Sequence, residues 1–149
     1  MLRKILLSLL VLSFFVTGTE SRAEKYVVAT DCTFPPMEYL DDQKQPVGFD
    51  PAIIKEIAKA SGFEVDVQNI AWDGIFAGLD SSRYDMAANG VEVTVERAMK
   101  YDFSTPYGYI RTALIVRGDR EDIASFEDLA GKRTANSISS TYMLLAERY

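Results

Sequence analysis

The side chains of this 149-residue chain that could do chemistry are carboxylates, aromatic rings and arginines, because the sequence has no histidine and one cysteine. A Ser-His-Asp or Cys-His nucleophilic site requires histidine, and a Cys/His zinc site requires more ligands than one thiol supplies. The net charge is −6, and without a Lys/Arg cluster nucleic-acid binding is disfavoured, because phosphate affinity comes mostly from basic side chains. We therefore expect no histidine-dependent catalytic residue, no metal site and no nucleic-acid partner, and we expect no cofactor.

The first candidate segment is 31–38, which follows a predicted strand and contains Asp31 and Phe34. Two prolines come directly after Phe34, so its ring is held stiffly. Ligands of open α/β sheets bind at the carboxyl ends of the strands, which makes both residues candidates to line a ligand site. A core position for Phe34, covering the edge of the sheet, is equally consistent with this segment.

The second candidate segment is 71–75, which contains Trp72, the only tryptophan of the chain. Trp72 lies beside a predicted helix start and close to Gly74, so its ring could be presented to a ligand. A single tryptophan is more often part of a core than a ligand wall. The segment alone therefore leaves both alternatives open.

The third candidate segment is 89–97. Gly90 would let backbone groups approach a ligand closely. Arg97 carries a planar guanidinium that can bind a carboxylate through two parallel hydrogen bonds. The alternative is a surface ion pair of Arg97 with Glu92 or Glu96, which is common and contributes little to stability.

Elements that would position these residues alternate along the chain. Apolar runs of β-branched or alternating type predict strands, and capping residues before periodic apolar positions predict helices. The predicted strands are 26–30, 63–67, 85–88, 109–116 and 133–136. The predicted helix caps are Asp50, Asp73, Thr94, Ser125 with Asp128, and Ser139 or Ser140, and a loop is predicted at 31–48. This alternation predicts an α/β fold with a mainly parallel sheet.

The N-terminal segment 1–23 has the pattern of a cleavable signal peptide. Arg3 and Lys4 precede an apolar run at 5–16, and small residues lead to a cleavage site after Ala23. A membrane anchor is the alternative, but the run is well short of the roughly 20 apolar residues that a spanning helix needs. We therefore expect an exported, periplasmic protein.

Six short motifs follow one another along the chain and together carry a resemblance. They resemble those of the bacterial extracellular solute-binding proteins of family 3, the polar amino-acid-binding proteins of ABC importers, over nearly all of the chain from Tyr26. The resemblance implies a periplasmic-binding-protein-like, two-lobed clamshell that holds a free amino acid between its lobes. The motifs are Phe34-Pro35-Pro36-Met37-Glu38, Gly48-Phe49-Asp50, Trp72-Asp73-Gly74, Tyr84-Asp85, Thr94-Val95-Glu96-Arg97 and Asp102-Phe103-Ser104-Thr105-Pro106-Tyr107.

The resemblance also implies a division of the chain and a set of partners. Residues 24–110 would form most of lobe one, and residues 111–149 the hinge crossing and the first part of lobe two. Because family members complete lobe two and then return to lobe one, we expect this chain to be a truncated member. Its partners would be a free amino acid and a membrane permease, and the protein would be a monomer.

Carried over by position, five residues of lobe one would meet the ligand. Phe34 and Trp72 would be aromatic walls around the ligand side chain, and Asp31 would face the same pocket. Arg97 would bind the α-carboxylate, and Gly90 would provide backbone contacts.

The remaining carried-over residues depart from the usual family pattern. Glu92 stands where the family often has Ser or Thr, so it could bind the α-ammonium, favour cationic ligands, or neutralise Arg97. The segment Ser139, Ser140 and Thr141 matches the part of lobe two that meets the carboxylate at a helix N-terminus, where backbone amides favour an anion.

Two other functions stay open beside binding without catalysis. One is a cleft enzyme on the same scaffold, of the cyclohexadienyl or arogenate dehydratase type, in which the Glu92 carboxyl would act as the acid. The other is a sensory input domain of a receptor or kinase. The preferred hypothesis is a non-enzymatic binding protein for a polar or charged amino acid.

Overall fold

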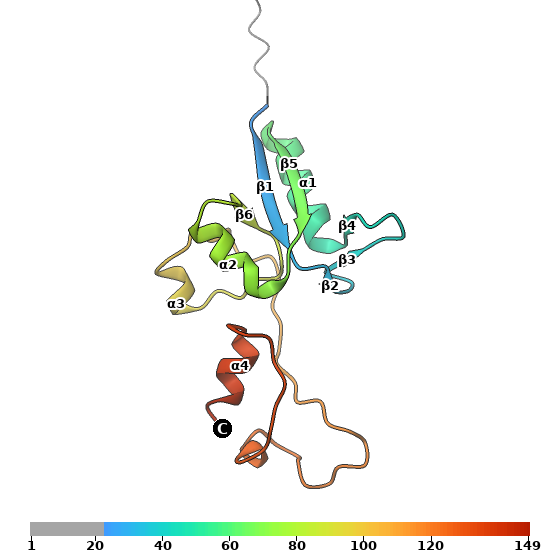
Figure 1. Ribbon diagram of the computed structural model, residues 1–149, viewed down its shortest axis with the longest axis vertical. Coiled ribbons are helices and arrows are strands. Elements are labelled where there is room, and N and C mark those ends of the chain that lie inside the picture. Colours follow the sequence, from blue (N-terminus) through green and yellow to red (C-terminus); the bar gives the residue numbers. More distant parts are fainter. Residues whose placement is uncertain (1–22) are drawn as a thin grey trace, which may run out of the picture.

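The computed structural model describes residues 23–149 of the chain. The predicted signal peptide lies outside the described residues except for Ala23. Figure 1 shows an α/β body, residues 24–101, connected by an extended arm, residues 102–116, to a smaller second body, residues 117–149. Within 23–149, no helix is long and apolar enough to cross a membrane.

A three-stranded parallel sheet forms the centre of the α/β body, with strands β1 (Lys25–Thr30), β5 (Glu64–Asn69) and β6 (Met86–Ala87). The order is β5-β1-β6, and both outer strands run parallel to β1. The β-branched and small residues at the end of β1 are fully buried, because both neighbouring strands and the helices enclose this strand. These strands confirm the predictions at 26–30, 63–67 and 85–88.

Two helices make the crossovers between the parallel strands, as Figure 1 shows: α1 (Phe49–Ser61) and α2 (Trp72–Asp80). Gly62 ends α1 in the left-handed conformation and donates its N–H to Ala58 O, which confirms the predicted stop. The predicted caps Asp50 and Asp73 are wrong, since Gly48 and Ala71 occupy the cap positions. Asp50 lies in the first turn of α1 instead, and its carboxylate accepts a hydrogen bond from the backbone N–H of Gly90.

Position 48 requires a glycine, because the backbone there lies very close to the backbone of Met37. Its φ is 118°, and a Cβ atom added there would lie 2.5 Å from Met37 O. The N–H groups of Phe49 and Asp50 donate to Pro36 O and Met37 O at 3.2 and 3.0 Å. The start of α1 is therefore fastened directly to the segment around Met37.

Residues 31–48 form a small antiparallel sheet, so the prediction of a loop with little regular structure is wrong. The Asp41 carboxylate accepts hydrogen bonds from the backbone N–H groups of Gln43 and Gln45 at 2.9 and 2.8 Å, which closes the turn between the last two strands. The strands are β2 (Thr33–Phe34), β3 (Glu38–Leu40) and β4 (Pro46–Val47), in the order β2-β3-β4.

The short helices α3 (Val95–Ala98) and α4 (Thr141–Ala146) begin at their predicted caps. Thr94 Oγ1 accepts from the backbone N–H of Arg97 at 3.1 Å, and Ser140 Oγ accepts from that of Met143 at 3.1 Å. Both predicted caps are confirmed. Each cap could be predicted because it needs only a hydroxyl group three residues before the backbone N–H that donates to it.

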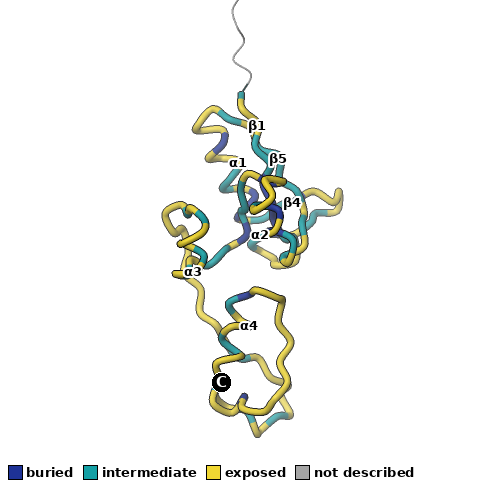
Figure 2. The backbone as a smooth tube through the Cα atoms, turned by 60° about the vertical axis from the view of Figure 1, so that its left-hand side comes forward, coloured by how far each residue is buried: buried dark blue, intermediate teal, exposed yellow. Residues whose placement is uncertain are grey.

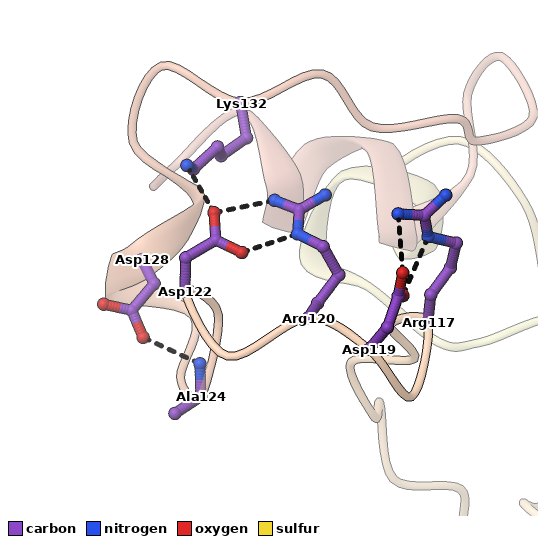
Figure 3. Close-up of polar contacts among 7 residues, drawn as sticks. All are labelled: Arg117, Asp119, Arg120, Asp122, Ala124, Asp128 and Lys132. Atoms are coloured by element: carbon purple, nitrogen blue, oxygen red, sulfur yellow. Dashed lines mark hydrogen bonds and ion pairs between the residues drawn. The ribbon is translucent and has the colours of Figure 1, made fainter.

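The second body contains a cluster of polar contacts (Figure 3). Asp122 pairs with Arg120 and Lys132 at 2.5 and 2.9 Å, and these cations lower the pKa of Asp122 far below its usual value. A 3-10 turn, η1 (Glu127–Leu129), forms near the predicted capping box, where Asp128 accepts from Ser125 N and Oγ.

The predicted strands at 109–116 and 133–136 are wrong, because neither segment has a strand partner in the described part of the chain. Tyr109 is 95% exposed and Ile115 is 91% exposed. A β-branched run becomes a strand only where another strand satisfies its backbone groups.

The hydrophobic core lies between the parallel sheet and α2, around Ala29, Ile75 and Tyr84. Figure 2 shows buried residues concentrated in the α/β body and mostly exposed residues in the second body. Gly78 allows the Tyr84 ring to lie against α2, since a Cβ atom there would be 2.0 Å from Tyr84 Cε2.

Candidate binding site

The carboxyl end of β1 is a corner where side chains hold three loops together. Asn89 Oδ1 accepts from Thr30 Oγ1 at 3.2 Å and from the backbone N–H of Asp31. Asp31 Oδ2 in turn accepts from the backbone N–H of Trp72 at 3.0 Å, at the start of α2. The Asp31 carboxylate thus lies at the predicted end of the sheet and fixes the position of Trp72.

An aromatic pair and one cation stand next to this corner. The rings of Trp72 and Phe76 meet edge to face, with their centroids 5.4 Å apart. The guanidinium carbon of Arg97 lies 5.5 Å from the Trp72 centroid and 4.9 Å from the Phe76 centroid. Both distances are within the range of cation–π attraction, so the rings hold the guanidinium in a defined place.

The polar contacts of Arg97 are with carbonyl oxygens. Its Nη1 donates to Glu92 O at 3.0 Å, and its Nη2 donates to Ser139 O at 2.9 Å. Among residues 23–149 it forms no ion pair, so the expected alternative of a surface pair with Glu92 or Glu96 is not what the structure has. Burial lowers the pKa of Arg97 from its ordinary value, while nearby Glu92 opposes the shift, and arginine stays charged.

The second body contacts the α/β body at this same place. Trp72 Nε1 donates to Ile138 O at 3.1 Å, beside the bond from Arg97 to Ser139 O. Ser139 has a positive φ of 61°, and Ser140, which caps α4, is 5% exposed. Residues 138–141 therefore face Trp72 and Arg97, although these segments are far apart in sequence.

Comparison with known proteins identifies the family. Residues 26–143 match the bacterial extracellular solute-binding proteins, family 3. The chain belongs to this family. It is 42% identical over 120 residues to the L-cystine-binding protein TcyA of Bacillus subtilis, covering 80% of this chain and 44% of that protein. It is 31% identical to the ABC transporter arginine-binding protein 1 of Escherichia coli, covering 95% of this chain and 56% of that protein.

Solved structures agree with this family assignment. The structure of an ancestral arginine-binding protein bound to arginine superimposes with a TM-score of 0.79 at 34% identity, over 85% of this chain and 56% of that one. The chain spans about half the length of the curated relatives that it matches. Its periplasmic-binding-protein-like α/β fold is therefore shown, as part of a two-lobed protein.

The other expected site residues lie on β2, in the turn at Gly90, near Arg97 and at the start of α4. Phe34 lies on β2 and is 53% exposed, so it is not a core residue. Gly90 has a left-handed φ of 53° and donates its N–H to Asp50 Oδ2. Glu92 is half-buried and contacts Arg97 through its backbone carbonyl. Thr141 begins α4.

Three buried polar residues near the site were missed by the sequence analysis. Asn89 and the carboxylates Glu38 and Asp50 are 9%, 1% and 1% exposed. Glu38 stands in the motif that begins at Phe34, and Asp50 was predicted as a helix cap, so the sequence did not assign either carboxylate to a buried site. Burial, together with the neighbouring Asp50 carboxylate, raises the pKa of Glu38 to about 8.

A hollow of about 780 Å³ opens on the α/β body and shares Phe76 and Asn89 with the surroundings of the candidate site. Its walls include Ile53, Ile54 and Ile57 of α1 and Tyr107 of the arm, but neither Trp72 nor Arg97. The walls are mainly apolar, and their basic residue, Lys100, is already paired with Asp80 at 2.6 Å. The cluster around Arg97 is the better candidate site for a polar ligand.

Proposed function

We propose that this protein is the periplasmic substrate-binding component of an ABC importer and binds a free polar or charged amino acid between two lobes. The observation that carries the proposal is the state of Arg97. Its guanidinium is half-buried over two aromatic rings, and its described hydrogen bonds go to two uncharged carbonyl oxygens. A carboxylate supplied by a ligand would complete this site.

The donor count of Arg97 supports a carboxylate ligand. A guanidinium has five N–H donors in a planar fork, and two of them are used by Glu92 O and Ser139 O. The remaining donors suit the two oxygens of a carboxylate, whose charge would also be paired where water is partly excluded. Trp72 and Phe76 offer apolar faces for the aliphatic part of an amino acid.

The names of the relatives support the ligand class. Relatives are described as binding L-cystine or arginine, and a related ancestral protein has been solved with glutamine bound. All three ligands are polar amino acids. These names are those of binding proteins, and we propose that this protein likewise performs no catalysis.

We propose that residues 24–110 belong to lobe one and residues 111–149 to the hinge crossing and the start of lobe two. The bonds from Trp72 to Ile138 and from Arg97 to Ser139 support this division, because they bring the two parts together at the candidate site. Closure of the lobes around a ligand is a hinge motion that would link binding to recognition by a permease. Export by cleavage of residues 1–23 and a monomeric state belong to the same proposal.

The ligand contacts that we propose follow from these positions. Arg97 binds the α-carboxylate together with the segment Ser139, Ser140 and Thr141. The Glu92 carboxylate beside Arg97 binds the α-ammonium group. The side chain of the ligand lies among Asp31, Phe34 and Trp72, and the turn at Gly90 contributes its backbone.

The test is a calorimetric titration of the full-length protein with the common amino acids, followed by variants at Arg97. Arg97→Ala should weaken binding by about 2–5 kcal/mol, that is by roughly 30-fold to several thousand-fold, because it removes a buried charged partner. Arg83→Ala, at an exposed arginine of the same body, is the matched control and should bind as the wild type does. Absence of binding to any amino acid by the folded protein would overturn the proposal, and equal affinity of Arg97→Ala would overturn the role of Arg97.

A further inference from the structure

Two carboxyl groups lie together in the interior of the α/β body, next to the turn that carries Gly90. Glu38 comes from β3 and Asp50 from the first turn of α1, and each is 1% exposed. The bond from Asp50 N to Met37 O, at 3.0 Å, brings their backbones together. Neither carboxyl forms an ion pair within the described chain.

These carboxyl groups are incompletely hydrogen-bonded. Asp50 Oδ2 accepts from the N–H of Gly90, but Asp50 Oδ1 and Glu38 Oε2 are buried with no donor among residues 23–149. A buried acceptor without a donor is costly, and two adjacent buried negative charges are more costly still. One proton on Glu38 removes both costs, because it leaves a single charge and turns Oε2 into a donor toward Asp50.

The surroundings favour this protonated state. Burial and then the Asp50 carboxylate raise the pKa of Glu38 to about 8, and Asp31 adds to the shift. Tyr107, at the arm, also faces Asp50; burial and this carboxylate raise the pKa of its phenol, which therefore stays a donor. The Glu38 carboxyl and the Tyr107 phenol therefore both keep their protons where they face Asp50.

The charge on Asp50 is connected to the candidate site through the turn at 89–90. The Asp50 carboxylate accepts a hydrogen bond from the N–H of Gly90. The side chain of Asn89, the residue before Gly90, accepts one from the backbone N–H of Asp31. Asp31 fixes the N–H of Trp72, and the Trp72 ring lies under Arg97. A shift of this turn would therefore move the groups that we propose to meet the ligand.

We propose that Asp50 is a positioning residue for ligand binding, which holds the Asn89–Gly90 turn in place only while the carboxyl of Glu38 keeps its proton. The expected effect on ligand affinity rests on the proposed function, the binding of an amino acid. Deprotonation of Glu38 places a second negative charge beside Asp50, which disrupts the hydrogen bond from Gly90. Ligand affinity should then fall as the pH rises above about 8.

The test uses the full-length protein with Glu38→Gln, Asp50→Asn and, as the matched control, Glu56→Gln at an exposed carboxyl of α1. The first readout is the hydrogen-exchange protection factor of the Gly90 amide, measured by NMR without ligand from pH 6 to pH 10. The second readout is amino-acid affinity over the same range. The Glu38→Gln side chain donates to Asp50 at every pH, so it should abolish the pH dependence of Gly90 protection. It should also remove the fall in affinity near pH 8, and leave only the fall at higher pH that all variants share because the ligand's own ammonium group loses its proton.

In the wild type and in Glu56→Gln, protection of Gly90 and affinity should each fall at least tenfold above about pH 8. Asp50→Asn should lower protection of Gly90 at pH 6, because an amide oxygen is a weaker acceptor than a carboxylate. Identical pH profiles for the wild type and Glu38→Gln would overturn the proposal, even if Asp50→Asn does not fold. If no amino acid binds, the proposed function fails, and the exchange of Gly90 still decides whether Asp50 and Glu38 hold the turn.

Discussion

Replacing Glu38 by glutamine should remove a pH dependence from the free energy of unfolding. The carboxyl group is 1% exposed and lies beside Asp50, so the folded protein keeps it protonated. The unfolded chain releases that proton near the ordinary pKa of 4.5, whereas the folded chain releases it at about 8. Because folding raises this pKa, the stability from Glu38 is complete below pH 4.5 and is lost as the pH rises towards 8.

The size of this effect follows from the interval between the two pKa values. Each pH unit inside the interval changes the free energy of unfolding by about 1.4 kcal/mol. From pH 5 to pH 8, the wild type should therefore lose about 4 kcal/mol relative to Glu38→Gln, which has no carboxyl to deprotonate. The 149 residues contain no histidine, so no other side chain with an ordinary pKa titrates in the middle of this range.

The assay is urea unfolding followed by circular dichroism at pH 5, 6, 7 and 8, with linear extrapolation to water. Glu56→Gln, at an exposed carboxyl, should follow the wild type within about 0.5 kcal/mol at each pH. The difference between wild type and Glu38→Gln should grow steadily with pH. A difference that changes by less than about 1 kcal/mol over this range would refute the argument that burial keeps Glu38 protonated.

Two further substitutions test the core and the contact between the two bodies. Gly78→Ala should lower the free energy of unfolding by about 1–3 kcal/mol in urea titrations, because its methyl group would overlap the Tyr84 ring. Gly74→Ala is the control, since its Cβ would lie 3.5 Å from the nearest atom, and an equal loss there would contradict the packing argument. Trp72→Phe removes the donor to Ile138 O and should weaken amino-acid binding by about 0.5–1.5 kcal/mol in calorimetry; unchanged affinity would show that this bond does not support the bound state.

Arg97 illustrates how the candidate site differs from a simple surface ion pair. Its sequence neighbours Glu92 and Glu96 offer carboxylates, yet the guanidinium contacts carbonyl oxygens and lies over two aromatic rings. The charge is thereby held in place without being paired. Such an arrangement suits a group that receives its anion from outside the chain.

Local features of this protein could be predicted from the sequence because their determinants are adjacent in the chain. Thr94 and Ser140 cap helices through donors three residues away, and Gly62 ends α1 because a left-handed residue is needed there. The motifs around Phe34, Trp72 and Arg97 indicated the family for the same reason. Each motif is a short run whose pattern is visible without coordinates.

The predicted strands at 109–116 and 133–136 show where local pattern is insufficient. Both have residues suited to strands, but a strand also needs partners for its backbone groups. The described chain provides none, and both segments stay without strand pairing. The small sheet at 31–48 is the reverse case, since it forms in a proline-containing segment, where the Asp41 turn brings β3 and β4 together.

The sequence by itself determined the family, the parallel α/β order of the elements and the residues around which a site is expected. Only the tertiary structure decided that Asp50 is a buried acceptor for Gly90 and not a helix cap, and that Glu38 lies beside it. It also decided that Arg97 meets Ser139. These contacts join residues distant in the chain, so their chemistry depends on burial and on neighbours that no local pattern encodes.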